Sequence, residues 1–363
     1  MTELHPVLRR LGMTTPIVQA PMAGVSTPAL AAAVSEAGGL GSLGLGAMSV
    51  EAARAAIRET RRLTDRPFSV NLFCHRSEEC APDRAAAWLE WLRPEFARYD
   101  AVPPESLREI YLSFLDNDAM LTMLAEERLA LVSFHFGAPS AHAANVLRRS
   151  GALLATSVTS VLEAQVADAA GMDVLIAQGH EAGGHRGVFD PQGADRKLPL
   201  HTLLGELSQT TSTPLFAAGG LMNGRDVAAV LQAGACAAQL GTAFVAADES
   251  AASPAYRTAL AASGSASEGD VTVMTSAISG RPARCLVNRF TALGARNDRP
   301  ATPPYPYAYD AGKALDAAAR AGGESGYGAF WAGSGVRRSR FIPAAQLVAT
   351  LTREWRAGGA ESA

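Results

Sequence analysis

The feature that most constrains the fold is an eightfold alternation of short apolar runs with alanine-rich segments of helical periodicity. The runs are too continuously hydrophobic for a sheet with one face in water, which is typical of parallel strands buried on both faces. The predicted strands are Pro16–Gln19, Gly41–Leu45, Phe68–Phe73, Ala130–Phe136, Leu153–Val158, Val174–Gln178, Leu215–Ala218 and Ala237–Leu240. The helices predicted between them are Pro28–Ala37, Val50–Arg62, Ala141–Ser150, Ser160–Ala170, Leu200–Ser208 and Gly224–Ala233. This alternation predicts an α/β fold, a TIM (β/α)8 barrel, with a doubly wound open sheet as the alternative.

Two regions exceed what a simple barrel needs. An insertion after strand 3, residues 74–117, would emerge at the face where barrel active sites lie, so we expect it to act as a lid. A C-terminal helical extension, residues 248–363, ends in a predicted helix near Pro343–Arg356. We therefore predict a barrel over residues 1–247, with the extension packed on it and closing the substrate pocket.

Composition and charge exclude several classes of partner. The 363 residues are 48% hydrophobic and 18% charged, which is enough apolar material for a core and argues against disorder. The net charge is -3 and basic residues gather nowhere, so we expect no nucleic acid partner. Apolar runs stop well short of the roughly 18 residues that a membrane span needs, and the chain begins without an apolar signal region. The four cysteines form no CxxC pair. We expect a cytoplasmic protein, a monomer or small homo-oligomer.

Glycines follow the last two predicted strands. Gly219 and Gly220 come after the seventh strand, and Gly241 and Thr242 come after the eighth. Loops at these two positions form the common phosphate site of TIM barrels, because glycine lets the backbone approach an anion and the amides and hydroxyl can bind it. Either glycine pair alone would be ordinary turn chemistry. Together they predict a phosphate site, and no GxGxxG or Walker lysine suggests a nucleotide fold instead.

Amide side chains are expected at the same barrel mouth. Asn71 ends the third strand and Gln178 ends the sixth. Amides can hydrogen bond the polar edge of a flavin ring, while the backbone of residues 21–23 passes beneath it. One phosphate site and these amides together indicate FMN, although a lone amide would more often be a cap or turn residue.

Three histidines lie at strand ends. His185 follows two glycines in the loop after the sixth strand, where an imidazole suits acid–base chemistry or binding of an anionic substrate. The spacing from His180 through Glu181 to His185 is HExxxH, and its glycines break a helix, so no zinc site and no other metal is expected. His180 is interpreted as a loop residue. His135, at the end of the fourth strand, is either a core histidine or a pocket donor.

Tyr305, Tyr309 and Lys313 are spaced at i, i+4 and i+8, which is one face of a helix if a helix begins there. They form either a packing stripe with an extended lysine or a pocket wall of phenols and an ammonium group.

Several strings of the chain together resemble the nitronate monooxygenases. They are PIVQAPMAG, FSVNLF, SFHFG, QGHEAGGHRG, AAGG and QLGTAF, followed by the C-terminal YGAFWAGSGV, which is similar to the ending of the bacterial class I enzymes. The resemblance implies a TIM barrel that holds FMN without a covalent bond, and it places His185 as the catalytic histidine. Flavin contacts are implied for Met22, Asn71, Gln178, Gly183, Gly220, Gln239, Leu240, Gly241 and Thr242. Substrate contacts are implied for His135, Tyr111, Tyr305, Tyr309 and Lys313.

The activity implied by this resemblance is oxidation of alkyl nitronates such as propionate 3-nitronate, with FMN and O2, to nitrite and an aldehyde-type product. Two alternatives stay open from the sequence. One is an NAD(P)H-dependent quinone or enoyl-acyl-carrier-protein reductase with a similar barrel, and the other is a flavin-binding protein without turnover. The sequence leaves open whether Tyr256 or Trp331 reaches the pocket.

Overall fold

The structure is a computed structural model that describes residues 4–265 and 271–360. Its centre is a parallel eight-stranded sheet in the order β1-β9-β8-β6-β5-β4-β3-β2. The strands are β1 (Ile17–Gln19), β2 (Gly41–Gly44), β3 (Phe68–Phe73), β4 (Leu131–His135), β5 (Leu153–Val158), β6 (Val174–Gln178), β8 (Leu215–Ala218) and β9 (Ala237–Leu240). Hydrogen bonds from Leu40 N to Ile17 O (3.0 Å) and from Gln19 N to Leu40 O (2.9 Å) close β1 against the start of β2. The predicted TIM barrel is confirmed, and all eight predicted strands lie within two residues of their expected bounds.

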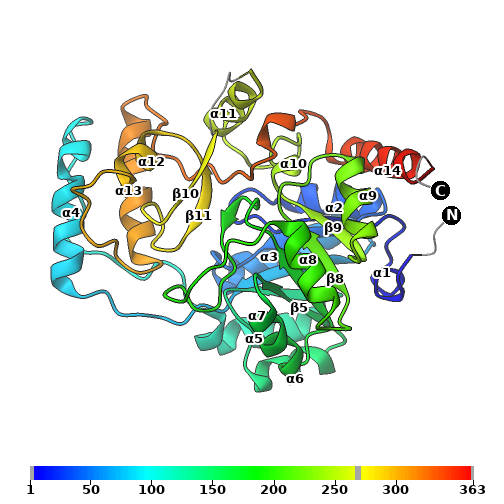
Figure 1. Ribbon diagram of the computed structural model, residues 1–363. Helices are drawn as coiled ribbons and strands as arrows, with labels where there is room; N and C mark the ends of the chain where they lie inside the picture. The colour runs from blue at the N-terminus through cyan, green and yellow to red at the C-terminus, as the bar shows by residue number, and fades with distance from the viewer. Residues whose placement is uncertain (1–3, 266–270, 361–363) are drawn as a thin grey trace.

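Helices surround this barrel (Figure 1). They are α2 (Pro28–Glu36), α3 (Val50–Leu63), α5 (Asp118–Glu127), α6 (Ala141–Arg149), α7 (Val161–Ala169), α8 (Leu200–Ser208), α9 (Gly224–Gln232) and α14 (Ala344–Ala360). Most begin at a side-chain cap, as when Ser140 accepts a bond from Ala143 N (3.1 Å). The six helices predicted between strands are present, and α5, which begins directly after the predicted insertion, is an additional helix that was not predicted.

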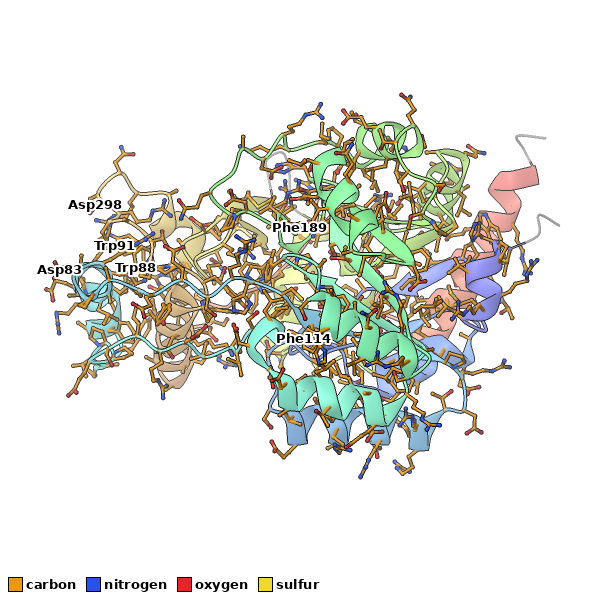
Figure 2. All side chains as sticks on the ribbon, turned by 90° about the horizontal axis from the view of Figure 1, so that it is seen from below. Asp83, Trp88, Trp91, Phe114, Phe189 and Asp298 are labelled. Atoms are coloured by element: carbon orange, nitrogen blue, oxygen red, sulfur yellow. The ribbon has the colours of Figure 1, made fainter. Side chains whose placement is uncertain are left out.

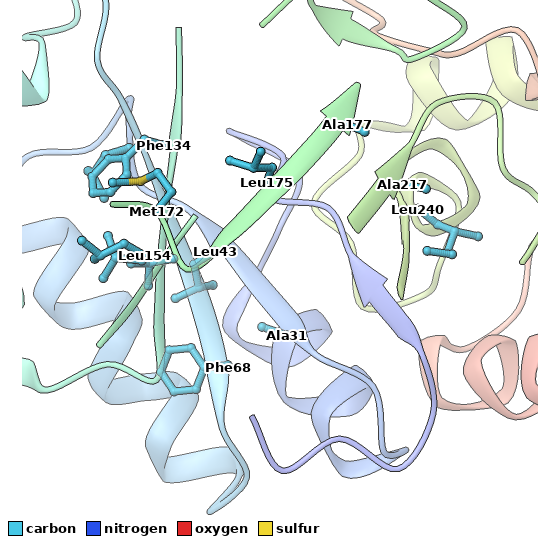
Figure 3. Packing of buried hydrophobic residues seen from close by; sticks show 14 of the residues in the cluster. Ala31, Leu43, Phe68, Phe134, Leu154, Met172, Leu175, Ala177, Ala217 and Leu240 are labelled. Atoms are coloured by element: carbon cyan, nitrogen blue, oxygen red, sulfur yellow. The ribbon is translucent and has the colours of Figure 1, made fainter. Parts of the chain in front are cut away.

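Apolar side chains fill both layers of the barrel. Between the strands and the outer helices, Leu154, Phe134 and Met172 pack against one another (Figure 3). Inside the barrel, Val174 and Phe216 contact a second cluster that also contains residues of the short helix α1 (Pro6–Arg10) and its C-terminal turn. The amino-terminal end of the barrel is thus filled, and the open end is the one where the strands finish.

A second region, which we call the lobe, lies beside the barrel (Figure 1). It comprises residues 74–112 and 271–332, and its elements are α4 (Pro82–Ala97), β10 (Thr272–Thr275), β11 (Ala283–Leu286), α12 (Arg289–Gly294) and α13 (Tyr307–Ala321). Its core is separate from that of the barrel: Trp88 and Phe96 of α4 pack with Phe290 and Leu315. Figure 2 shows Trp88 and Trp91 at the far side of the lobe from the barrel. The insertion and part of the C-terminal extension therefore fold together.

The chain crosses between the two regions in both directions. Strand β7 (Gly184–His185) comes from the loop after β6 and pairs antiparallel with β11 of the lobe. Helix α10 (Thr242–Val245) follows β9 directly. Helix α11 (Pro254–Ser265), which precedes the second segment of the lobe, packs beside η2 (Val336–Arg338), which follows that segment. Helix α14 then returns to the barrel, packs on α9 and α2, and adds Leu347 and Leu351 to the barrel core. The domain boundary at residue 247 stays a prediction, since the extension divides between lobe and barrel.

Among the described residues, none of the helices combines the length and the apolar character that crossing a bilayer requires.

Candidate functional site

A cavity of about 640 Å3 lies at the carboxyl ends of the barrel strands and is bounded on one side by the lobe. That size lies within the range usual for sites that bind small molecules and cofactors. The predicted site residues that line it are Met22, Asn71, Tyr111, His135, Gln178, Gly183, His185, Gly220, Gln239, Gly241, Thr242, Tyr305, Tyr309 and Lys313. Leu240 does not line the cavity, because its side chain is buried in the barrel core.

The glycine loops after β8 and β9 meet at one end of this cavity. Gly219 and Gly220 have φ angles of +138° and +70°, which L side chains rarely adopt. In the loop after β9, the Thr242 hydroxyl accepts a hydrogen bond from Gly333 N at 2.9 Å. That contact occupies an acceptor position of the hydroxyl, so its proton is available to a ligand. Backbone and hydroxyl donors at a glycine cradle are suited to an anionic group such as a phosphate.

The predicted amides have partners inside the protein. Asn71 donates one hydrogen bond to Ser133 Oγ at 2.9 Å. Gln178 donates to the carbonyl of His185 at 2.9 Å and accepts from Gly187 N at 2.8 Å. Gln178 therefore spans the loop that carries His185 and fixes its path, whatever contact it makes with a ligand.

His185 stands at the junction of barrel and lobe. Four aromatic side chains surround its imidazole: Phe136 at 5.6 Å, Tyr305 at 5.6 Å, Trp331 at 5.1 Å and Tyr309 at 6.2 Å between ring centroids. Its Nε2 lies 2.9 Å from Ser279 Oγ. The ring is thus held on several sides while the residue still lines the cavity.

Burial keeps His185 neutral. Removal from water lowers its pKa to about 3, and the nearby His135 and Arg281 shift it in the same direction. A neutral imidazole at ordinary pH has an unshared electron pair and accepts a proton, whereas it adds no positive charge for an anion.

His135 supports the loop of His185 through a hydrogen bond to its backbone. Its Nε2 is 3.1 Å from the His185 carbonyl, and its Nδ1 is 2.9 Å from Ser157 Oγ. Because a carbonyl oxygen only accepts, the His135 proton must be on Nε2 and Nδ1 must accept from Ser157. Both ring nitrogens are occupied, so the structure places His135 as a supporting residue in the cavity wall.

The lobe supplies the opposite wall. Helix α13 begins at Tyr307, so Tyr305 precedes it and only Tyr309 and Lys313 lie on the helix, one turn apart. The Lys313 ammonium lies 5.1 Å from the ring of Tyr111 and 5.4 Å from that of Tyr309. All of these residues line the same cavity, which favours the pocket-wall interpretation of the stripe.

The phenols of this wall are neutral donors. Burial raises the pKa of Tyr111 to about 12 and raises the pKa of Tyr309 further. The hydroxyl of Tyr305 is buried and has no hydrogen-bond partner among the described residues. Tyr111 and Tyr309 are therefore better placed than Tyr305 to donate to a ligand.

Some residues of the site had no clear signal in the sequence. Trp331 and Tyr256 both line the cavity, and the Tyr256 hydroxyl donates to the Trp331 carbonyl. Ser279 and Arg281 lie in the β10–β11 turn, with nothing in their spacing to connect them to His185. His180 is outside the cavity, as expected of a loop residue, and no cluster of three potential metal ligands occurs in the part of the chain that the structure describes.

Comparisons with known proteins agree with this architecture. The family model described as nitronate monooxygenase matches residues 6–354. The chain is 54% identical over 353 residues to the nitronate monooxygenase of Paraburkholderia phytofirmans, covering 97% of this chain and 95% of that one. It is 50% identical over 348 residues to that of Pseudomonas aeruginosa, covering 96% and 98%.

A solved structure of nitroalkane oxidase from Streptomyces ansochromogenes superimposes with a TM-score of 0.87 at 39% identity, covering 98% of this chain and all of that one. Since the family model spans nearly the whole chain and both sequence relatives are at least half identical to it, the chain is an enzyme of the nitronate monooxygenase family.

Proposed function

We propose that this enzyme oxidises alkyl nitronates of the propionate 3-nitronate type, with FMN and O2, and releases nitrite and an aldehyde-type product. Membership of the family implies a flavin cofactor and nitronate oxidation. The observation that carries the finer proposal is one cavity with a glycine-lined anion cradle at one end and an ammonium group with two phenols on the opposite wall.

The barrel side of the cavity fits FMN. Gly220, Gly241 and Thr242 would hold the phosphate, with the Thr242 proton donated to it. Asn71 and Gln239, together with the backbone beside Met22, would hold the ring, and the bound flavin would supply the electron acceptor for the substrate.

The lobe side fits a nitronate, which is already an anion. Tyr309 and Tyr111 would donate hydrogen bonds to it, and the positive charge of Lys313 at the mouth would attract it. No acidic side chain forms an ion pair with Lys313 within the described residues, so its charge is not neutralised there. The substrate wall is thus positive on balance at its outer end.

His185 would have a separate role, which is proton transfer. Because its imidazole is neutral, it would act as the base that removes a proton from a neutral nitroalkane, producing the nitronate in place. The C–H bond breaks, its electron pair forms the C=N bond of the nitronate, the π pair of the N=O bond moves onto oxygen, and the proton goes to the imidazole. The negative charge formed beside the ring then stabilises the imidazolium.

The test is oxygen uptake by the purified yellow protein on addition of propionate 3-nitronate with no NADH present. The proposal predicts fast uptake accompanied by release of nitrite. Absence of uptake with FMN bound would overturn it and would favour NAD(P)H-driven reduction of a quinone or enoyl substrate.

A further inference from the structure

The turn between β10 and β11 places a buried hydroxyl against the imidazole of His185. Ser279 is fully buried, and its Oγ lies 2.9 Å from His185 Nε2. The same oxygen lies 3.2 Å from the carbonyl of Arg281 and 3.4 Å from the N–H of Arg281. Three polar groups therefore surround one hydroxyl.

The hydrogen-bonding capacity of a hydroxyl group decides which of these groups donates to Ser279 and which accepts from it. A serine hydroxyl has one proton to donate and two positions at which it can accept. The Arg281 N–H can only donate to it, and the Arg281 carbonyl can only accept from it. If the serine proton goes to the carbonyl, the remaining acceptor position is free for a proton on His185 Nε2.

The opposite arrangement leaves one buried polar group without a hydrogen bond. If the Ser279 proton went to Nε2, the Arg281 carbonyl would lose its donor, and the described residues provide no other hydrogen bond to that oxygen. Leaving a buried carbonyl unpaired is costly, so the first arrangement is favoured. It places the imidazole proton on Nε2.

The other ring nitrogen then faces the ligand. His185 lines the cavity, and its Nδ1 forms no hydrogen bond with any residue that the structure describes. Phe136 closes one side of the ring; it has φ +72°, an unusual conformation for a bulky residue, and the Arg281 guanidinium lies 4.1 Å over its ring. The aromatic rings packed around His185 favour this orientation, in which Nε2 faces Ser279.

We propose that Ser279 is a positioning residue that holds the proton of His185 on Nε2 and so leaves Nδ1 as the atom that accepts the substrate proton. The catalytic part of this statement rests on the proposed function, in which His185 deprotonates neutral nitroalkanes. The tautomer itself is a property of the resting protein and does not depend on which substrate is oxidised.

The direct test is the nitrogen NMR spectrum of the flavin-loaded protein labelled with 15N-histidine. The chain has seven histidines, and the His185 signals are identified by their loss in His185→Asn. We expect a neutral ring with a protonated Nε2 and an unprotonated Nδ1. A proton on Nδ1 in the wild-type protein would overturn the proposal without any need for a serine variant.

Variants of Ser279 provide a second test of the proposal. Ser279→Ala should move His185 to a mixture of tautomers, and Ser279→Thr, which retains the hydroxyl, should restore the wild-type signals. Ser276→Ala, in the same turn but without a side-chain hydrogen bond among the described residues, is the matched control. An unchanged tautomer in Ser279→Ala would contradict the role of the serine.

Kinetics separate this inference from the proposed function. In Ser279→Ala, kcat with a neutral nitroalkane should fall about tenfold, whereas kcat with the preformed nitronate should change less than about twofold. Equal losses with both substrates would contradict a role in positioning the base. A wild-type protein with no activity on either substrate would overturn the proposed function while the NMR result still stood.

Discussion

The two walls of the cavity come from regions that are built differently. The barrel wall consists of strand ends and glycine turns whose positions follow from a repeated βα unit, and its core is continuous with the outer helices. The lobe wall is assembled from two segments far apart in sequence, 74–112 and 271–332, around a separate apolar core. In our account the barrel holds the cofactor, the lobe holds the substrate, and His185 lies on the strand that joins them. Substrate preference can therefore change in the lobe without disturbing the cofactor site.

Replacing the residue at the junction should have the largest effect. His185→Asn removes the base, so turnover of a neutral nitroalkane should fall about 10²- to 10⁴-fold, the usual contribution of general base catalysis. Flavin should stay bound, and oxidation of the preformed nitronate should be much less affected. Stopped-flow reduction measured with both forms of one substrate checks this, and equal losses would place His185 in binding instead.

A change confined to the barrel wall should remove the cofactor. In Gly220→Ala, the new Cβ would lie 3.1 Å from Glu181 Cβ at a φ of +70°, so the turn after β8 must shift. We expect bound flavin, measured as the ratio of flavin to protein absorbance, to fall about tenfold or more. Gly323→Ala is the matched control, because Gly323 has φ +80° with no atom within 4 Å of the added Cβ. Full flavin occupancy in Gly220→Ala would show that the cradle is elsewhere.

A change in the lobe core should weaken the lobe alone. Trp88 is fully buried in α4, and Trp88→Ala should destabilise the lobe by about 3–5 kcal/mol. Thermal unfolding followed by circular dichroism should show an earlier transition, while flavin release, followed by its fluorescence, stays at a higher temperature. Trp91→Ala, a half-buried neighbour whose ring is 4.9 Å away, should have a smaller effect. A single joint transition would mean that the two regions do not unfold separately.

The smallest expected effect is that of pH, because kcat/KM for a neutral nitroalkane should not change near neutral pH. The pKa of His185 is lowered by burial to about 3, so the neutral base is fully present above about pH 5 and is lost only as the pH falls through about 3. The kcat/KM for a neutral nitroalkane should therefore be flat between about pH 5 and 7. Loss of half the activity near pH 6.5, the ordinary pKa of histidine, would contradict the burial of this group.

The barrel could be predicted from sequence because each strand is a continuous apolar run and each glycine turn follows a strand end. Gly219 and Gly220 adopt φ angles that favour glycine, so their residue type indicates their role, and the order of the strands brings them beside the turn at Gly241. The sequence of the lobe segments shows no comparable repeat of apolar strands and glycine turns. Its pairing of α4 with α13 depends on apolar contacts between distant segments, and the role of Ser279 depends on a strand pairing, β7 with β11, that two residues of sequence cannot specify.

The intermediate cases were the tyrosines and the lysine. The spacing of Tyr309 and Lys313 indicated one helix face, yet whether that face lined a pocket or a core depended on where α13 packs. Tyr305 lies before the helix, and its hydroxyl is shielded, which no spacing rule distinguishes from an exposed phenol.

The measurement that tests the division between barrel and lobe most directly is to determine flavin content and the KM for propionate 3-nitronate together in Lys313→Met. The chain's other lysine, the exposed Lys197, gives the control Lys197→Met. We predict full flavin occupancy in both variants and a KM raised about tenfold only in Lys313→Met, since the attraction of a positive charge for the anionic substrate is lost. Loss of flavin in Lys313→Met, or an unchanged KM, would contradict the assignment of the substrate to the lobe wall.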